Sequence, residues 1–145
     1  MSFDDLKSVT VWTNGCFDVL HRGHIELFKK CYELAGPEGT VIVGIDSDER
    51  VRKNKGSGRP INTVSDRLEM LMSIRYIDQV DVFDSDDKLR ELIRDVYKPD
   101  VMIVGDEYGN KEVMGSEFCK CEPMFFAKIG KYSTSDIVGE KTESS

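Results

Sequence analysis

Apolar positions along the chain follow two spacings, one typical of strands and the other of helices. Short runs of β-branched and aromatic residues predict strands at 9–13, 40–45, 79–83, 101–104 and 123–127. Between these runs, apolar residues recur three and four positions apart, as on the buried face of a helix. The helical positions are Leu27, Phe28, Cys31, Leu34 and Ala35, then Val64, Leu68, Leu71, Met72 and Ile74, then Leu89, Leu92, Ile93 and Val96.

This order of elements predicts an α/β fold. Strands alternate with helices in units of about 30 residues, which is typical of right-handed βαβ crossovers. We therefore expect a Rossmann-like, open parallel sheet of five strands with helices on both faces. Ligands of such sheets bind beyond the C-terminal strand ends, where the strand order reverses. Because no Gly-x-Gly-x-x-Gly follows the first strand, the usual dinucleotide site is disfavoured.

The turn between the first strand and the first helix carries the densest candidate chemistry. It contains Gly15, Asp18, His21, Gly23 and His24. His21 and His24 are the only two histidines in the sequence. Such a turn places backbone N–H groups and the positive end of the helix dipole at the sheet edge. Two imidazoles three residues apart add side-chain donors, so the pattern predicts a phosphate site. The alternative is that the histidines only cap or pack the helix start.

A group of cations follows the second strand, although the chain carries a formal net charge of -7. Its members are Arg50, Arg52, Lys53, Lys55 and Arg59. Together with Gly56 and Gly58, they predict a mobile basic loop that closes over bound phosphate. The alternative is an ordinary solvated run of charges.

Length and composition limit the class of protein. The 145 residues, 39% of them hydrophobic, suit a single domain over 1–145 with a polar, frayed tail from about 139. The acidic balance argues against a nucleic-acid partner. Neither a signal peptide nor a membrane span is recognisable, so we expect a cytoplasmic protein with no membrane partner.

The cysteines give no sign of a disulfide framework or a structural metal. Cys16, Cys31, Cys119 and Cys121 lack the regular spacing of disulfide-rich domains, and we expect free thiols. Cys119 and Cys121 form at most half of a zinc site, because no further pair remains once the histidines are assigned to phosphate. We therefore assign no metal-ligating residue.

The stretch His21-Arg22-Gly23-His24 resembles the His-x-Gly-His motif of the cytidylyltransferase-like nucleotidyltransferases, and the preceding 14–18 strengthens the likeness. Later segments resemble the family in the same order, from about 11 to 138. They are the lysines at 53 and 55, Arg67 at the next helix start, Arg75-Tyr76-Ile77-Asp78-Gln79-Val80, the Gly-Asp pair at 105–106 and the Ser-Thr segment at 132–136.

Other segments resemble a sister branch, the sugar-phosphate nucleotidyltransferase domain of ADP-heptose synthesis. These are 13–18, 59–62 and 115–117. One departure from many cytidylyltransferases is Lys128-Ile129-Gly130-Lys131, which stands where they carry Arg-Thr-x-Gly. The chain therefore combines features of both branches.

The resemblance implies transfer of a nucleoside monophosphate from CTP or ATP to the phosphate of a small polyol or sugar phosphate, with release of pyrophosphate. It also implies Mg²⁺ as cofactor and, by analogy, a homodimer. The acceptor phosphate, with a second pKa of about 6, is largely dianionic at neutral pH, so no general base is required. A nucleotide-binding regulatory module without turnover is the alternative, and an aminoacyl-tRNA synthetase fragment is a more remote one.

Roles carried over by resemblance divide into three groups. The catalytic residues are His21, His24 and Lys55; the nucleotide-binding residues are Gly15, Cys16, Phe17, Asp18, Gly23, Lys53, Asp106, Ser133, Thr134 and Ser135; the substrate-binding residues are Asp48 and Arg67. Asp18 is expected to orient the histidines or a metal. The segment 133–135 also begins the last predicted helix.

Overall fold

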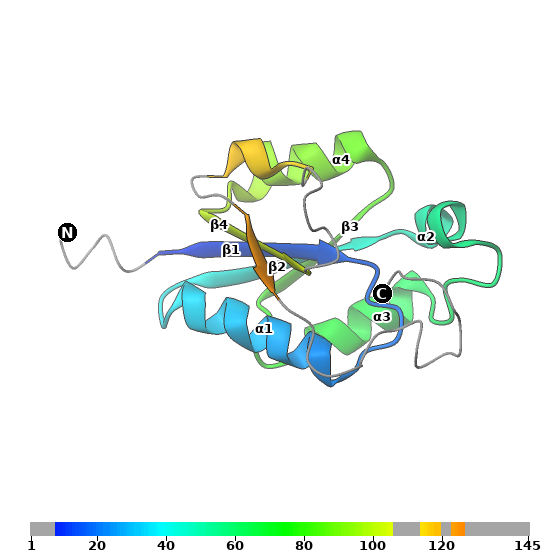
Figure 1. Cartoon of the computed structure of the whole chain (residues 1–145), viewed down its shortest axis with the longest axis horizontal. Coiled ribbons are helices and arrows are strands. Elements are labelled where there is room, and N and C mark those ends of the chain that lie inside the picture. Colours follow the sequence, from blue (N-terminus) through cyan, green and yellow to red (C-terminus); the bar gives the residue numbers. More distant parts are fainter. Residues whose placement is uncertain (1–7, 106–113, 120–122, 127–145) are drawn as a thin grey trace.

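The computed structural model describes residues 8–105, 114–119 and 123–126, and its centre is a parallel sheet (Figure 1). The strands are β1 (Thr10–Gly15), β2 (Thr40–Asp46), β3 (Gln79–Phe83), β4 (Val101–Gly105) and β5 (Met124–Phe126). They lie in the order β3-β2-β1-β4-β5, and every neighbouring pair is parallel. The predicted fold class is confirmed, with β5 as a short strand at one edge.

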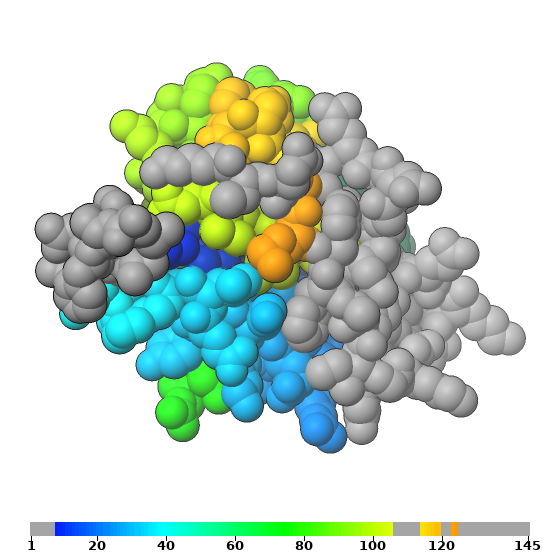
Figure 2. Space-filling model, turned by 60° about the vertical axis from the view of Figure 1, so that its left-hand side comes forward, coloured from blue at the N-terminus to red at the C-terminus, as the bar shows by residue number. Residues whose placement is uncertain are grey.

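Helical segments connect the strands and cover both faces of the sheet (Figure 1). They are α1 (Arg22–Ala35), α2 (Asp48–Lys55), α3 (Val64–Met72), α4 (Asp86–Glu91), the π-helical η2 (Leu92–Tyr97) and the 3₁₀ turn η4 (Ser116–Phe118). On the surface, β5 lies between α1 and the turn that includes η4 (Figure 2). No helix among these described segments is long and apolar enough to cross a membrane.

Two apolar cores follow from the alternation of side chains along each strand. On β1, Val11 packs into a core with Leu27, Phe28 and Leu71 from α1 and α3. The next residue, Trp12, faces the opposite core, which holds the apolar residues of α4 and η2. Both strand residues are fully buried. The sheet is therefore covered on both sides, as its near-continuous apolar strands predicted.

The C-terminal ends of the parallel strands lie at one edge of the sheet, and the order of the strands reverses at β1. From β1 to β2 and β3 the chain moves in one direction across the sheet, whereas β4 and β5 lie on the other side of β1. The switch point is thus the C-terminal edge between β1 and β4. The turn that begins at Gly15 lies at this edge, where the sequence placed the phosphate site.

The predicted basic loop is only partly a loop. Residues 48–55 form α2, capped by the Ser47 hydroxyl, which accepts from the Arg50 N–H at 3.2 Å. Acidic side chains lie in the first turn of α2 and basic ones in its last turn, which suits the helix dipole, and Val51 is buried. The irregular part of the predicted loop is reduced to 56–59. The high density of charged residues in this segment favoured a loop in the sequence analysis, whereas the segment forms a short, well-capped helix.

Three residues assigned to buried helix faces are exposed instead. Val96 is 51% exposed, Met72 is 44% exposed and Leu68 is 36% exposed. For Val96 the cause is local, because η2 has π-helical bonding and the spacing of three and four no longer selects one face. Leu68 and Met72 lie on a nine-residue helix whose fully buried positions are Arg67 and Leu71.

Candidate active site

The turn after β1 is held in a conformation that few residues adopt. Phe17 has φ +48°, in the left-handed region, which is uncommon for a bulky side chain. Its ring folds back over Gly15, where an added Cβ would lie 3.2 Å from the ring's Cζ. Cys16, Phe17 and Asp18 are all buried. A side chain at position 15 would therefore push the ring away and open the turn.

The two histidines cap α1 reciprocally. His21 is the N-cap residue, and its Nδ1 accepts from the Gly23 N–H at 3.0 Å. In return, the His21 N–H donates to Nδ1 of His24 at 3.2 Å. The rings are stacked, with centroids 3.9 Å apart. The capping alternative is therefore correct as geometry, and the pair forms a capping box made from imidazoles.

These caps fix the tautomer of each histidine. A ring nitrogen that accepts a backbone N–H carries no proton of its own. Because Nδ1 is the acceptor in His21 and in His24, each neutral ring carries its proton on Nε2. The Nε2–H group lies on the part of the ring remote from the helix backbone. The helix start thus supplies two oriented side-chain N–H donors.

His24 is held in its neutral form. It is 9% exposed, and its ring meets Phe17 edge to face at 5.3 Å between centroids. Burial, together with the smaller effect of the neighbouring His21, lowers the pKa of His24 from its usual 6.5 to about 3. Near pH 7 this ring is therefore a neutral hydrogen-bond donor rather than a cation.

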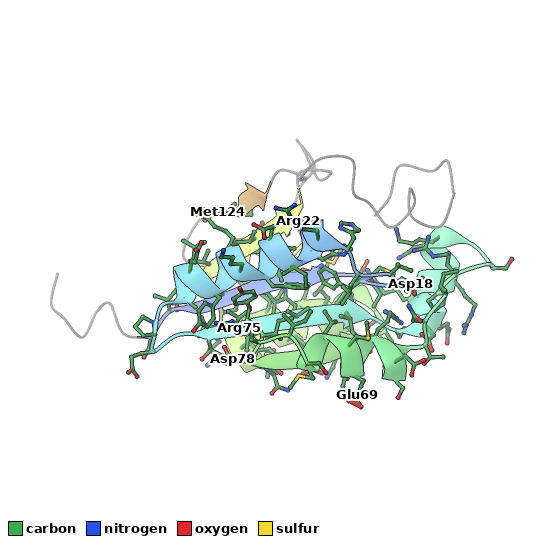
Figure 3. The ribbon with its side chains drawn as sticks, turned by 90° about the horizontal axis from the view of Figure 1, so that it is seen from below. Asp18, Arg22, Glu69, Arg75, Asp78 and Met124 are labelled. Atoms are coloured by element: carbon green, nitrogen blue, oxygen red, sulfur yellow. The ribbon has the colours of Figure 1, made fainter. Side chains whose placement is uncertain are left out.

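Asp18 is held by the segment that follows α2. Its carboxylate accepts from Arg59 Nε at 2.9 Å and from the backbone N–H groups of Ile61 and Asn62, at 2.6 and 2.7 Å. In Figure 3, Asp18 lies toward the end of the sheet opposite Arg75 and Asp78. The sequence predicted that Asp18 orients the histidines or a metal. Its described partners belong instead to 59–62, a role that local patterns did not reveal.

Arg67 joins the ends of two strands. Its guanidinium donates to the carbonyl oxygens of Cys16 and Asp46 at 3.0 and 2.8 Å. It also donates to the Asp48 carboxylate at 2.7 Å and to the Asn62 carbonyl at 3.1 Å. Arg67 is 1% exposed. The structure thus brings the predicted substrate residues Asp48 and Arg67 together; contact of either with a substrate stays a prediction.

The predicted lysines leave α2 in different directions. Residues two apart on a helix project to opposite sides. Lys55 is partly buried. Burial raises the pKa of the Cys16 thiol, and the nearby charges of Arg67 and then Lys55 oppose that rise. Lys53 is exposed and lines a separate pocket. Lys55 is therefore near the turn at Cys16, whereas the expected assistance from Lys53 stays a prediction.

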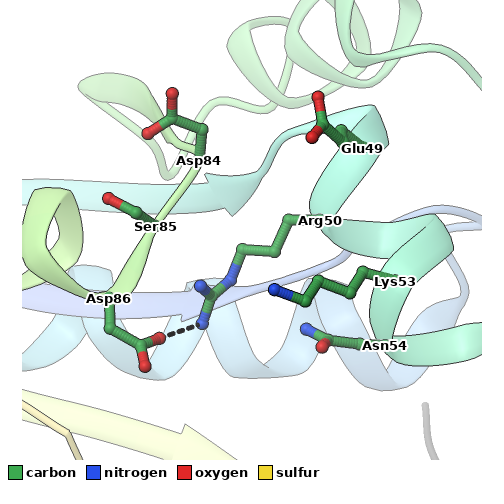
Figure 4. A pocket seen from close by; sticks show the side chains of 7 residues that line it. All are labelled: Glu49, Arg50, Lys53, Asn54, Asp84, Ser85 and Asp86. Atoms are coloured by element: carbon green, nitrogen blue, oxygen red, sulfur yellow. Dashed lines mark hydrogen bonds and ion pairs between the residues drawn. The ribbon is translucent and has the colours of Figure 1, made fainter.

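That separate pocket, of about 400 Å³, lies between α2 and the start of α4 (Figure 4). Arg50 extends across it to Asp86 at 2.7 Å and also bonds Asp46 at 2.7 Å. The lining carries three carboxylates and two cations, from Glu49, Asp84, Asp86, Arg50 and Lys53. Because these charges nearly cancel, the pocket is unsuited to a triphosphate, in contrast to the N-terminus of α1.

Several predicted site residues lie outside the described residues. They are Asp106, Ser133, Thr134 and Ser135. The Gly105 that precedes them ends β4.

Gly23 lies in the first turn of α1 and donates its N–H to the His21 cap. In the part of the chain that is described, Cys16 and Cys31 are free thiols; Cys121 lies outside it.

A resident divalent cation has few ligands available here. Within the described ranges, no three His, Cys, Asp or Glu side chains gather as a metal site. The Asp18 carboxylate is occupied by one guanidinium and two backbone N–H groups. Magnesium usually keeps several waters and binds through substrate phosphates. This donor set fits Mg²⁺ that arrives with a nucleotide better than Mg²⁺ held by the protein.

The buried His24 predicts a pH-dependent stability. Unfolded His24 takes up a proton as the pH falls below 6.5, whereas the folded residue takes it up near pH 3. Its neutral burial therefore contributes stability above pH 6.5 that is lost progressively as the pH falls toward 3. Urea unfolding at pH 7 and pH 4.5 should show that His24→Gln, which does not titrate, loses roughly 2 kcal/mol less than the wild type. Equal losses in the two proteins would contradict the neutral assignment.

Comparison with known proteins agrees with this geometry. The family described as cytidylyltransferase-like matches residues 12–139. The bifunctional protein HldE of Helicobacter hepaticus is 43% identical over 135 residues, which cover 92% of this chain and 27% of that protein. The protein of the same name from Nitratiruptor sp. is 44% identical over 127 residues, covering 88% and 26%. The chain thus spans about a quarter of the length of these relatives.

A solved structure carries the same fold. The lipopolysaccharide core biosynthesis protein from Thermoplasma volcanium GSS1 aligns with a TM-score of 0.60 and 27% identity. The alignment covers 86% of this chain and 98% of that one. The range matched by the family, 12–139, contains the turn after β1, α2 and α3. This chain belongs to the cytidylyltransferase-like family and is a nucleotidyltransferase.

Proposed function

We propose that the chain transfers a nucleoside monophosphate from a Mg²⁺-bound triphosphate, ATP or CTP, to the phosphate of a small sugar or polyol phosphate, releasing pyrophosphate. The observation that carries this proposal is the pair of neutral imidazoles at the N-terminus of α1, each with its proton on Nε2. They lie at the positive end of the helix dipole, which favours an anion. The specific substrates go beyond the family assignment, because the chain spans only part of its relatives.

The reaction suits a site without a nucleophilic side chain. The acceptor phosphate is itself the nucleophile, and it attacks the α-phosphorus while the bond to the β-phosphate oxygen breaks. Charge grows on the α-phosphoryl oxygens and on the leaving pyrophosphate. Fixed N–H donors that already point toward this charge stabilise the transition state without reorganising. His21 and His24 fill this role in the proposal, and both remain hydrogen-bond donors throughout.

Other groups of the site position the two anions. The backbone of 15–17 receives the α-phosphate, and Lys55 neutralises the β- and γ-phosphates or the acceptor. Mg²⁺, when bound to the nucleotide, spreads the charge of the pyrophosphate that leaves. Holding two polyanions in line is worth a large part of the barrier, because repulsion otherwise keeps them apart. Asp106 and the segment 133–135 are assigned to the nucleoside and triphosphate by resemblance.

Among possible substrates, we favour ATP and a sugar 1-phosphate, as in a heptose-1-phosphate adenylyltransferase. Support comes from the resemblance of 13–18, 59–62 and 115–117 to the nucleotidyltransferase domain of ADP-heptose synthesis. The solved relative is also described as a protein of lipopolysaccharide core biosynthesis, and that core contains sugars. CTP with glycerol 3-phosphate is the second candidate, supported by the resemblance of 75–80. Because nucleoside triphosphates are intracellular metabolites, we propose a cytoplasmic site of action.

A pyrophosphate-release screen tests the activity and the substrates together. ATP, CTP, UTP and GTP are each combined with Mg²⁺ and with sugar 1-phosphates, glycerol 3-phosphate, choline phosphate or ethanolamine phosphate. We expect the highest rate with ATP and a sugar 1-phosphate. If no pair releases pyrophosphate while calorimetry still detects nucleotide binding, the chain is a nucleotide-binding module instead. Release with CTP and glycerol 3-phosphate alone would move it to the other branch.

A cap-preserving variant separates the two roles of His21. Asparagine is a good N-cap, and its Oδ1 replaces the accepting Nδ1, but it has no counterpart of Nε2–H at the same reach. His21→Asn should therefore keep the melting temperature while lowering kcat by about 10²-fold. His21→Ala loses both functions and should also destabilise the protein by about 1 kcal/mol. Full activity of His21→Asn would reduce the histidine to a cap.

The orientation of α2 predicts unequal roles for its cations. Lys55→Ala should lower kcat by about 10²-fold with little change in stability, because the substitution removes the cation that neutralises the leaving group. Arg52→Ala removes a cation from the exposed surface of the same helix and serves as the control, with activity within about twofold of the wild type. Lys53→Ala should have a smaller effect than Lys55→Ala. Steady-state kinetics decide the matter, and equal losses at positions 52 and 55 would indicate a general charge effect.

We also propose a homodimer. Support comes from apolar side chains that α3 leaves exposed, Leu68, Met70 and Met72, at 36%, 56% and 44%. Light scattering coupled to size exclusion should give twice the 16.5 kDa chain mass. Leu68→Glu with Met72→Glu should halve it, because each helix would bring two carboxylates to the shared surface. A wild-type protein that elutes as a monomer at micromolar concentration would refute the dimer.

A further inference from the structure

The bond between Arg59 and Asp18 is a buried ion pair that joins distant parts of the chain. Arg59 Nε lies 2.9 Å from Asp18 Oδ2, and their side chains are 1% and 0% exposed. The two residues are 41 positions apart in the sequence. Charged side chains are rarely buried to this extent unless they are paired. The pair therefore reflects a specific requirement of this part of the fold.

Three further hydrogen bonds complete the connection. The N–H groups of Ile61 and Asn62 donate to the Asp18 carboxylate, at 2.6 and 2.7 Å. The Asn62 side chain donates to the Asp18 carbonyl oxygen at 2.6 Å. We call residues 59–62 and Asp18 together the latch. Because residues 59–62 bind both the carboxylate and the backbone carbonyl of Asp18, the latch fixes the position and the direction of the chain at Asp18.

The latch holds the turn at its most strained point. Asp18 directly follows Phe17, whose left-handed φ persists only where the surroundings impose it. Three residues after Asp18 comes His21, the cap of α1. On its other side, the latch begins four residues after Lys55, across 56–58. One ion pair thus fixes the turn, the capped histidines and the end of the lysine-bearing segment relative to one another.

We propose that Arg59 is a positioning residue: acting through Asp18, it holds the turn at 16–18 and the His21 cap in the geometry that binds the transition state. This inference rests on the proposed nucleotidyl transfer. Arg59 need not touch the substrate. Small displacements of transition-state donors reduce kcat strongly while leaving ground-state binding almost intact. Loss of the latch should therefore affect kcat more than the KM for nucleotide.

A double-mutant cycle tests whether Arg59 acts through Asp18. Arg59→Met keeps an unbranched apolar side chain and removes the guanidinium with its charge; Asp18→Asn removes the opposite charge. We expect Arg59→Met to lower kcat per folded molecule by about tenfold or more, with KM for nucleotide within about threefold. The double variant should be no worse than the poorer single variant, because both changes break the same connection. Arg59→Lys, which keeps the charge, should recover part of kcat.

Controls separate positioning from stability. Arg94→Met removes a guanidinium from an exposed pair with Asp95 and should leave kcat and KM unchanged. Asn62→Ala removes one bond of the latch and should lower kcat by at least about threefold; it carries the test if Arg59→Met fails to fold. A lower melting temperature with unchanged kcat in every latch variant would make the latch purely structural. Losses that multiply in the double variant would mean that Arg59 contacts substrate directly.

A measurement on the free protein distinguishes failure of this inference from failure of the proposed function. The chain has only two histidines, so their ring ¹⁵N signals are readily assigned. The wild type should show both rings protonated on Nε2. In Arg59→Met, the His21 ring should show a mixture of tautomers, and the Gly23 amide should exchange faster. Unchanged tautomers and exchange would overturn the latch even if the enzyme is active; a wild type that releases no pyrophosphate would overturn the function alone.

Discussion

The buried guanidinium of Arg67 is the interaction on which this end of the molecule depends. Parallel strands that end side by side leave carbonyl groups without partners at the edge of the sheet. Arg67 satisfies one from the turn after β1 and one at the end of β2, and it also binds Asp48 at the start of α2. A rigid fork of donors matches several fixed acceptors at once, which lysine could not do. This single side chain therefore links the turn after β1, the end of β2 and the start of α2.

Structural arginines and a phosphate site share one small region of an acidic protein. Arg50, Arg59 and Arg67 each bond at least one carboxylate, so their charges stabilise the framework around the turn. In the proposed function, the attraction for a polyanion comes from Lys55, from the dipole of α1 and from the Nε2–H groups of two neutral rings. Such a site retains its hydrogen-bond geometry across a wide pH range, because burial keeps His24 from titrating near neutrality.

The sequence predicted the sheet and the location of the site because both follow from local spacing. Periodicity located the strands, and the strand-to-helix turn marked the switch point. The sequence interpretation was wrong about α2, which it took for a loop because the charge and glycine content outweighed the Ser47 cap. It also missed the π-helical η2, which breaks the helical period. The partners of Asp18 lie 41 to 44 residues away in the sequence, and one partner of Arg67 lies 51 residues away. Local patterns carry no information about such pairs; the grouping of 59–62 by resemblance was the one available sign.

The reciprocal cap also determines which atoms the site accepts. Each ring uses its lone pair on Nδ1 to hold the helix backbone, so Nε2 presents a proton and never a lone pair. Groups rich in acceptors, such as phosphoryl oxygens, find partners there, whereas ammonium groups find none. A transition metal is excluded by the same polarity, because coordination requires an unprotonated nitrogen. The helix cap thereby favours anions over cations as ligands of the two rings, because the direction of its hydrogen bonds leaves only N–H donors available.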